Sequence, residues 1–357
     1  MGRYVLQKIG YALLTLFGVV TVIFMLFAML PDDPAKMMLG QNQNAEQIAM
    51  VKKKYGLDKS IGTQYLLYLN DLSPISFHSN TKSDYTFLAP NKYSATTLFN
   101  FGNVTTVLKF PYLRESFQKS GKKVSSVIAE TLPNTFILAI SSITIAMILG
   151  VLLGIISVLF KDGWIDKMIQ LVSTFGMSVP SFFSAILFAW FFGYLLHKYT
   201  GLNMTGSLYE VDDFGEGKYI QLKNLILPAI VLGIRPLAVV SQLMRNSLLE
   251  VLNQDYIRTA KAKGLSMPKI IRKHALKNAL NPVVTAISGW FASMLAGAVF
   301  VEFIFGWNGM GKEIVDALNK SDLPIIMGMV LVIATLFIII NIFVDIIYGL
   351  LDPKISR

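Results

Sequence analysis

Charged residues inside long apolar stretches are the first candidates for function in this chain. Arg235 lies near the middle of such a stretch, beside Pro236, whereas Glu302 and Asp345 lie toward the ends of theirs. An unpaired charge at the centre of a bilayer costs at least about 2.5 kcal/mol, so Arg235 should face a wet cavity or a partner group. It could hold a transport path or gate together, or it could only pack helix ends through hydrogen bonds.

Ion-coupled transport and hydrolysis need groups that this sequence does not bring together. No carboxylate lies near the middle of an apolar stretch, as proton or sodium coupling would need. His78, His197 and His274 fall in separate segments, no HExxH or GxSxG pattern occurs, and the chain has no cysteine. The nucleotide-binding patterns GxxxxGKS and GxxxxGKT are also missing. We therefore expect a non-catalytic chain that binds no ATP, metal or cofactor itself.

A basic segment, residues 255–278, separates two apolar stretches and has the sequence DYIRTAKAKGLSMPKIIRKHALKN. It contains seven Lys or Arg residues and one Asp. Asp255 can cap a helix whose body runs from 256 to 263. Gly264 suits the left-handed residue that follows a helix end. The pattern therefore predicts a short helix that stops at a tight turn.

A second helix is expected directly after that turn, because Ser266 is a good cap and Pro268 fits a first helical turn. Both helices are short, and short helices are unstable without a partner. The first also offers small side chains, at Thr259, Ala260 and Ala262, that another protein could approach closely. We expect a docking surface for a partner protein. Alternatively, the positive charge only holds the loop in the cytoplasm and contacts anionic lipid.

Composition places these residues in a polytopic membrane protein. The chain is 54% hydrophobic and 15% charged, and its apolar residues gather in long runs. A helix needs about 20 mainly apolar residues to cross a bilayer. Six segments reach that length: 9–30, 134–160, 169–196, 224–244, 283–305 and 325–350. The first has a basic start like a signal peptide, but its apolar run is too long and lacks a cleavage site, so we expect a retained helix.

The net charge of +10 is explained by membrane topology and does not require nucleic acid. Segment 245–281 contains eight Lys or Arg residues against two acids, and short cytoplasmic loops collect such residues. This places both termini in the cytoplasm and residues 31–133 outside. The expected organisation is an N-terminal transmembrane helix within 1–30, the extracytoplasmic segment 31–133, a five-helix core within 134–350 that contains the basic loop, and a cytoplasmic end, 351–357.

The extracytoplasmic segment has its own pattern of helices and strands. Apolar residues at helical spacing predict two amphipathic helices within 44–72, with Gly56 and Gly62 as breaks. The following part, 73–111, is rich in Ser, Thr, Asn and aromatic residues and predicts loops and short strands. A second outer loop, 197–223, contains the acids Glu210, Asp212, Asp213 and Glu216. Their spacing lacks a full calcium-loop pattern, so we expect a solvated acidic loop.

Two inner apolar stretches contain prolines, Pro180 and Pro236, each preceded closely by a glycine, Gly176 or Gly233. Proline removes a backbone hydrogen bond and kinks or breaks a helix. Broken helices at membrane depth usually line a path enclosed by protein. We predict broken helices at both prolines, with packing irregularity as the alternative explanation.

Short motifs along nearly the whole chain resemble one transporter family. Arg258, Thr259 and Ala260, followed after three residues by Gly264, match the EAAxxxG loop of ABC importer permeases, and DYIRTAKAKGLS with HALKNALNPV has the form typical of oligopeptide, dipeptide and nickel importers. KIGYALLTLFGVVTVIFMLFAMLPDDPA, ETLPNTFILA, VEFIFGWNGMGK and DIIYGLLDPKISR resemble further elements of the first of that family's two permease types. Only 73–120 has no counterpart in the shortest members.

Three residues depart from the general family pattern. Arg258 replaces the Glu of EAAxxxG, as is usual in the peptide importers, Asp32 stands in place of Gly in LPGDP, and Asn308 stands in place of Pro in VExIFxWPGxG. The last two concern loop details.

The resemblance implies an all-α polytopic protein with six transmembrane helices, the type I ABC importer permease fold, and a large extracytoplasmic insertion after the first helix. It implies a heterodimer with a second permease, two cytoplasmic ATPases that hold ATP and Mg²⁺, and an outer binding protein that delivers peptide. The residues implied to couple to an ATPase are Asp255, Tyr256, Arg258, Thr259, Ala260, Lys261, Lys263, Gly264 and Leu265. The candidates for the path or gate are Pro180, Arg235, Pro236, Glu302 and Trp307, with Glu302 stabilising the outer turn FGWNGMG.

Three other classes compete with this interpretation: an ion-coupled secondary transporter, an intramembrane enzyme and a scaffold without transport. The first two lack the carboxylates or histidine motifs that their chemistry needs. The cargo stays open among oligopeptide, dipeptide, nickel chelate and signalling peptide, because the binding protein and the shape of the cavity decide it.

Overall fold

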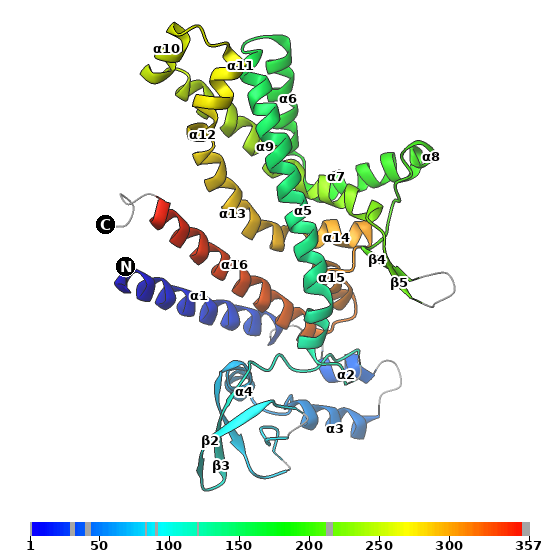
Figure 1. Ribbon diagram of the computed structural model, residues 1–357. Helices are drawn as coiled ribbons and strands as arrows, with labels where there is room; N and C mark the ends of the chain where they lie inside the picture. Colours follow the sequence, from blue (N-terminus) through cyan, green and yellow to red (C-terminus); the bar gives the residue numbers. More distant parts are fainter. Residues whose placement is uncertain are drawn as a thin grey trace. The chain divides into compact units, whose positions relative to one another are not determined.

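The computed structural model describes residues 2–28, 33–39, 44–82, 84–89, 92–119, 121–211 and 217–351. The chain divides into two compact units, residues 1–130 with 316–335 and residues 131–315 with 336–357. Figure 1 shows a mainly helical chain. The predictions for Asp32, for Asp212, Asp213 and Glu216, and for 352–357 lie outside the described residues.

Four described helices are long and apolar enough to cross a membrane. They are α1 (Gly2–Ala28), α5 (Val124–Leu159), α9 (Lys223–Val251) and α16 (Leu323–Leu351). Two bent pairs raise the number of candidate spans to as many as six. One pair is α6 (Trp164–Ser178) with α7 (Ser181–Phe188) and η1 (Ala189–Leu195), and the other is α11 (Met267–Ile270), η2 (Ile271–Ala275) and α12 (Leu276–Ala279) with α13 (Asn281–Gly297).

Two of the predicted spans are not single straight helices. Segment 169–196 is not one straight helix, because the chain turns by 109° after Ser178, at the predicted break near Pro180. Segment 283–305 is divided between α13 and the short α14 (Val299–Phe305). The prediction of a break at Pro236 is wrong: α9 continues through both Pro228 and Pro236. Packing of α9 against α6, α7 and α13 holds it helical despite the lost backbone hydrogen bonds.

The first unit carries a small domain of helices and strands after α1. It contains α2 (Pro34–Leu39), α3 (Ala45–Tyr55) and α4 (Ile61–Leu72). The last two confirm the two helices predicted within 44–72. Gly56 ends α3 with a left-handed φ of 70°, as predicted. Gly62 is not a break, because it lies inside α4, which begins after Ser60 with the Ser60 Oγ accepting from the Thr63 amide at 3.3 Å.

The strands of the first unit form an antiparallel sheet in the order β1-β3-β2. Their bounds are β1 (Ile75–Ser79), β2 (Ala95–Phe101) and β3 (Val104–Lys109). These strands correct the all-α description, although short strands are predicted for this segment. Every residue of β2 is exposed, whereas β3 alternates between exposed and buried positions.

The first unit joins this domain to the ends of two membrane helices. Val20, Ile23 and Phe24 of α1 form a buried cluster with Tyr68 of α4 and with Met327 and Leu331, the latter two on α16. The Thr21 and Tyr65 hydroxyls lie 2.6 Å apart. The small domain is therefore packed directly on helices that reach into the bilayer.

The second unit is built around α9, which contacts α6, α7, α13 and α14. Glycines allow α5 and α9 to approach closely: a Cβ added to Gly150 would lie 2.7 Å from Val240 Cγ1, and one added to Gly233 would lie 2.9 Å from the Ser142 carbonyl oxygen. Gly233 therefore serves close packing and not a hinge. The unit also contains α8 (His197–Thr200), an antiparallel pair β4 (Tyr209–Val211) and β5 (Lys218–Ile220), α10 (Asp255–Ala262) and most of α15 (Met310–Asn319).

Candidate functional site

The basic loop folds as a helix, a tight turn and a second helix, as predicted. α10 is followed by Gly264, which has a left-handed φ of 74°. The Gly264 amide donates to the Lys261 carbonyl at 2.9 Å, and the Leu265 amide donates to the Ala260 carbonyl at 3.3 Å. These bonds satisfy carbonyl groups at the end of α10. Glycine takes this conformation without the strain that any residue with a Cβ would suffer.

The start of α10 differs from the prediction. Gln254 is the extended residue before the helix, and Asp255 is already in the first turn, so Asp255 is not the cap. The Asp255 carboxylate instead lies 3.4 Å from Arg258 Nη1. Its negative charge still suits the positive end of the helix dipole. Ser266 precedes α11 with an extended backbone, and Pro268 falls in the first turn as predicted, but the Ser266 side chain makes no capping hydrogen bond.

α10 has one edge buried in its own chain. Ile257 and Ala260 pack in a cluster with Leu252 of the preceding segment and with Ile270 and Ile271 of the next helix. Ala260, which was predicted to face a partner, is buried in the internal packing of the loop. Ile257 was missed, although apolar residues three positions apart on a short helix are a signal for a buried edge.

The remaining side chains of α10 and its turn form an exposed basic face. Tyr256, Arg258, Thr259, Lys261, Lys263 and Gly264 are exposed, and Leu265 is half-buried. Asn278 Nδ2 of α12 donates to the Tyr256 hydroxyl at 2.9 Å. The face is thus attached to the adjoining helices by an apolar anchor and a polar link.

A bidentate ion pair lies between α6 and α9 and was not predicted. Arg245 Nε and Nη2 donate to the two carboxylate oxygens of Asp166 at 2.8 and 2.7 Å. The Ser157 hydroxyl and the Asp162 amide also donate to this carboxylate. In the sequence, Arg245 was counted only as one of the eight positive charges of segment 245–281. The pair fixes the start of α6 to the last part of α9, the helix that leads into α10.

A second candidate site is the turn between α14 and α15, where Glu302 is completely buried. Its Oε2 accepts hydrogen bonds from the amides of Gly311 at 2.6 Å and Lys312 at 3.4 Å. These amides lie in the first turn of α15, so the carboxylate caps that helix from a distance in sequence. A Cβ at Gly309 or Gly311 would collide with the carboxylate. Both glycines are therefore needed for the close approach of the turn to Glu302.

Trp307 ties the same turn to α5. Trp307 Nε1 donates to the Asn134 carbonyl oxygen at 3.0 Å, and Asn134 Nδ2 donates to the Asn308 carbonyl oxygen at 2.7 Å. The Met310 amide donates to Thr135 Oγ1 at 2.9 Å. Asn134 and Thr135 belong to the motif ETLPNTFILA but were not assigned to the site. Asn134 and Trp307 are 173 positions apart, and no local pattern in the sequence indicates that they are in contact.

Asn308 shows why the departure from the family pattern is tolerated. Its amide donates to the Ser207 hydroxyl at 3.1 Å, a bond that proline could not make. Lys312 Nζ donates to Asn308 Oδ1 at 2.9 Å. Asn308 therefore attaches the turn to the loop before β4 and to Lys312 of α15.

The path candidates fall in two separate places of the second unit. Pro180 is exposed and stands directly before α7, at the 109° bend. Arg235 is exposed, and its Nη2 lies 3.4 Å from the Met177 carbonyl oxygen next to the same bend, whereas Pro236 is buried within α9. Glu302 and Trp307 lie in the turn between α14 and α15. The proline and arginine candidates thus share one location, and the glutamate and tryptophan share the other.

The other polar candidates have structural roles where the structure describes them. Glu210 is half-buried and accepts hydrogen bonds from Asn224 Nδ2 at 2.6 Å and from the Tyr219 hydroxyl at 3.1 Å, so it is not a freely solvated acid. His78 is buried and contacts the Ser76 hydroxyl and the Thr86 carbonyl oxygen, each at 2.9 Å. Within the described ranges no group of three or more His, Asp or Glu side chains is arranged to hold a metal ion.

These features define a multi-pass membrane protein with an anchored basic loop, and two family descriptions match it. Residues 146–357 match "Binding-protein-dependent transport system inner membrane component", and residues 1–83 match the N-terminal part of such membrane components. The chain therefore belongs to the family of inner membrane components of binding-protein-dependent transport systems. It is a non-catalytic permease subunit of an ABC importer, as the motifs predict, and lies in the inner membrane.

Two relatives are similar over nearly their full length, and a third is similar over part of its length. The chain is 32% identical over 369 aligned positions to the dipeptide transport system permease protein of Alkalihalophilus pseudofirmus, covering 100% of both chains. It is 32% identical to the di/tripeptide transport system permease protein of Pseudomonas aeruginosa, covering 100% of this chain and 99% of the relative. The dipeptide permease of Haemophilus influenzae is 39% identical over 237 positions, 63% of this chain and 71% of the relative.

Proposed function

We propose that this chain is one of two permeases in an importer of dipeptides or oligopeptides, and that α10 receives the motion of a cytoplasmic ATPase. The coupling role is supported by the division of α10 into a buried edge and an exposed basic face. The peptide substrate is supported by full-length relatives that are named for dipeptide and tripeptide transport.

The proposal includes a set of partners and an orientation. The partners are a second, homologous permease, two cytoplasmic ATPases that hold ATP and Mg²⁺, and a binding protein that delivers peptide from outside. The excess of Lys and Arg in 245–281 supports a cytoplasmic basic loop, with both termini inside and residues 31–133 outside. In this arrangement 134–350 forms the permease core and 351–357 a cytoplasmic end.

The proposed mechanism transmits force through short, rigid connections. α10 has eight residues and is therefore about 12 Å long, a length that fits a groove on one ATPase. Its anchor at Ile257 and the bond between Tyr256 and Asn278 attach it to the following helices. The pair of Asp166 and Arg245 joins α6 to α9. Closure of the ATPases would then move these helices together as a rigid body.

The two groups of path candidates would have different tasks. At the α6–α7 bend, the exposed Arg235 would face the peptide path or the second permease, because a membrane-buried charge needs a polar partner. In the outer turn, Glu302 and Trp307 would hold the backbone that closes the path from outside. The candidates differ in exposure: Pro180 and Arg235 are exposed, whereas Pro236, Glu302 and Trp307 are buried.

The coupling role is tested by co-purification of the ATPases with two variants of equal charge change. Arg258→Glu with Lys261→Glu alters the exposed face of α10, and Lys273→Glu with Lys277→Glu alters exposed positions of η2 and α12. Ala260 is left unchanged because it is buried. We expect the α10 variant to lose the ATPases at least tenfold while the control keeps them. Equal retention by both variants would show that the charge only sets topology.

The substrate is tested separately by uptake in cells that express the complete transporter. Labelled dipeptide and hexapeptide are compared with nickel ions supplied with and without free histidine. We expect ATP-dependent uptake of peptide, abolished by the α10 variant. Uptake of nickel without uptake of either peptide would contradict the substrate assignment but leave the coupling role intact.

A further inference from the structure

A cavity of about 180 Å³ lies inside the first unit and has no part in the functions described above. Its walls combine apolar side chains from the membrane helices with charged side chains from the small domain. The apolar part includes Phe24 and Phe27 of α1 and Met327 of α16. The charged residues that line it are Asp33, Lys52 and Arg114.

The cavity lies where the hydrocarbon core of the bilayer meets the headgroups. Phe24, Phe27 and Ala28 are the last residues of one candidate span, and Leu323 and Met327 are among the first of another. Helix ends of this kind mark the interface, about 15 Å from the bilayer centre. An opening at this depth is therefore next to both acyl chains and phosphate groups.

Arg114 is held in an unusual conformation at this cavity. Its backbone φ is 67°, in the left-handed region that residues with a Cβ rarely occupy. Its Nε donates to Asp71 Oδ2 at 3.0 Å, and its side chain remains 19% exposed. Among the described residues this is the one hydrogen bond of its side chain, although a guanidinium has five N–H donors. The other four N–H groups make no hydrogen bond with the described residues, and the guanidinium lies 5.2 Å from the ring of Tyr68, which also lines the cavity.

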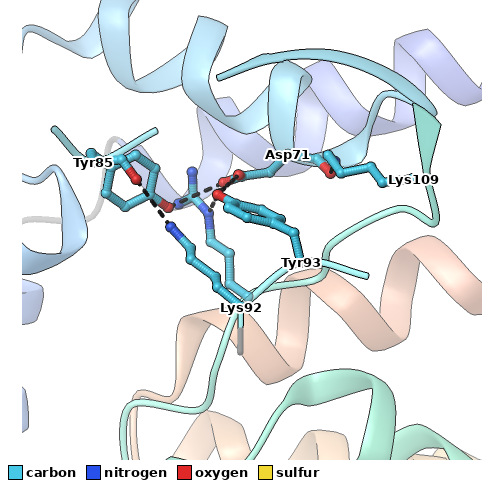
Figure 2. Close-up of polar contacts among 6 residues, drawn as sticks. Asp71, Tyr85, Lys92, Tyr93 and Lys109 are labelled. Carbon is cyan, nitrogen blue, oxygen red and sulfur yellow. Dashed lines mark hydrogen bonds and ion pairs between the residues drawn. The ribbon is translucent and has the colours of Figure 1, made fainter. Parts of the chain in front are cut away.

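A buried polar cluster behind the cavity fixes the position of this guanidinium. Figure 2 shows Tyr85 and Tyr93 converging on Asp71, to which their hydroxyls donate at 3.1 and 3.2 Å. Lys109 Nζ donates to the Asp71 carbonyl oxygen. Asp71 therefore has enough donors to stay in place, and the cation that it positions is presented to the cavity in a fixed geometry.

Lys52 is the second cation of the lining, and like Arg114 it is paired with a carboxylate. Lys52 Nζ lies 2.6 Å from Asp33 Oδ2, and the other oxygen of Asp33 accepts from the Ala35 amide at 3.1 Å. Asp33 and Asp71 balance Lys52 and Arg114, and Lys109 and Lys92 beside Asp71 leave the region with an excess of positive charge. Such a site favours an anion, and guanidinium groups suit phosphate oxygens in particular.

We propose that this cavity binds one anionic phospholipid from the adjacent leaflet. The phosphate would contact Arg114 and Lys52, and an acyl chain would lie beside Phe24, Phe27 and Met327. A free phosphate would satisfy the cations but leave the aromatic wall without a partner, so the whole lining suits a lipid. The lipid would join the small domain to α1 and α16 at the membrane surface.

The test uses the full-length chain purified in detergent and exchanged into detergent that contains either dioleoyl phosphatidylglycerol or dioleoyl phosphatidylcholine. Retained lipid per chain is counted by mass spectrometry after washing. Arg114→Gln removes the main phosphate ligand, and Ala28→Phe fills the apolar end of the cavity. Lys52→Ala is paired with Lys53→Ala, its neighbour on α3, which does not line the cavity. Circular dichroism and thermal unfolding confirm that each variant is folded.

We expect the native chain to retain about one more phosphatidylglycerol molecule than Arg114→Gln or Ala28→Phe. Lys52→Ala should bind it at least fivefold more weakly than Lys53→Ala, and soluble glycerol phosphate in 100-fold excess should not displace it. Equal retention of phosphatidylcholine would overturn the assignment of an anionic headgroup. Displacement by glycerol phosphate would reduce the site to a phosphate site, and unchanged retention in folded Ala28→Phe would exclude the cavity as the lipid's location.

Discussion

Glu302 acts as a helix cap inside the second unit. Its carboxylate accepts hydrogen bonds from two amides of the first turn of α15. The residue is completely buried, so these amides lie away from solvent that could replace the carboxylate. Among the described residues its second oxygen, Oε1, has no hydrogen-bond partner. One oxygen therefore carries the contact, and the loss of acceptor and the loss of charge can be separated by mutation.

We predict that Glu302→Gln costs about 1 kcal/mol of unfolding free energy and Glu302→Ala about 3 kcal/mol. Glutamine keeps one acceptor for the Gly311 amide and loses only charge, whereas alanine leaves two buried amides unpaired and a cavity. Thermal unfolding of the detergent-solubilised chain measures both. Equal destabilisation by the two variants would show that the charge, and not the acceptor, is what the turn requires.

Lys109 is a buried lysine whose environment opposes its charge. Burial lowers the pKa of Lys109 to about 8; Asp71 acts in the opposite direction, and the nearby Lys92 lowers it further. The unfolded chain binds this proton up to a pKa of 10.5, its ordinary value. Between pH 8 and pH 10.5 Lys109 is protonated more often in the unfolded chain than in the folded chain. The free energy of unfolding therefore increases as the pH rises through this range.

We therefore predict that the stability of the native chain relative to Lys109→Met increases from pH 8 to pH 10.5, and that the difference is constant below about pH 7. Below that pH the lysine is charged in both states, and the full cost of its burial is present. Thermal unfolding of both chains across this range measures the difference. A relative stability that falls with rising pH would show that Lys109 is held charged by Asp71.

At the scale of secondary-structure elements, the connection between α6 and α9 depends on one ion pair. Asp166 is almost completely buried and Arg245 largely so, and they share two hydrogen bonds. Removing one partner of a buried pair costs more than removing both, because a charge is left without compensation.

We predict that Asp166→Asn destabilises the chain by about 3 kcal/mol, and that adding Arg245→Met recovers part of this loss. A complete transporter that contains Asp166→Asn or Arg245→Met should still hydrolyse ATP at its ATPase subunits. It should take up less peptide, because α6 would no longer move with α9. Thermal unfolding and uptake are measured on the same preparations. Strict additivity of the two substitutions would mean that the side chains do not interact.

Local sequence signals predicted the elements well where the causes are local. The Gly264 turn follows from glycine conformation, and the two helices of the small domain follow from apolar residues at helical spacing and from the break at Gly56. Pro180 marked a bend because no helix crosses it, whereas Pro236 failed as a marker because neighbouring helices support α9 there. The sequence does not show whether neighbouring helices pack against the segment that contains a proline.

Contacts between distant residues were beyond local signals. Asp166 and Arg245 are 79 positions apart, and Trp307 meets Asn134 across 173 positions. The same limit applies to the burial of Ala260, whose partners in the core include residues of another helix. A small side chain can equally serve an internal contact or an external one, and only the tertiary structure decides between them.

At the scale of the whole molecule, composition and family motifs predicted a multi-pass permease, and the family match confirms it. The division into two units was not predicted, because it groups residues 316–335 with the first 130 residues. Long-range packing, and not continuity of sequence, sets that grouping. The proposed role of the small domain in binding lipid rests on its cavity and buried charges, which depend on that packing.

The exposed strand β2 has a practical consequence for handling this protein. In the described sheet β2 pairs on one side only, with β3, and it carries Phe99 and an 89% exposed Phe101. An open edge with aromatic side chains is a template for adding further strands, the geometry from which fibrous aggregates grow. Unless something covers this edge, concentrated preparations of the isolated subunit will tend to self-associate in water even when detergent shields every membrane helix.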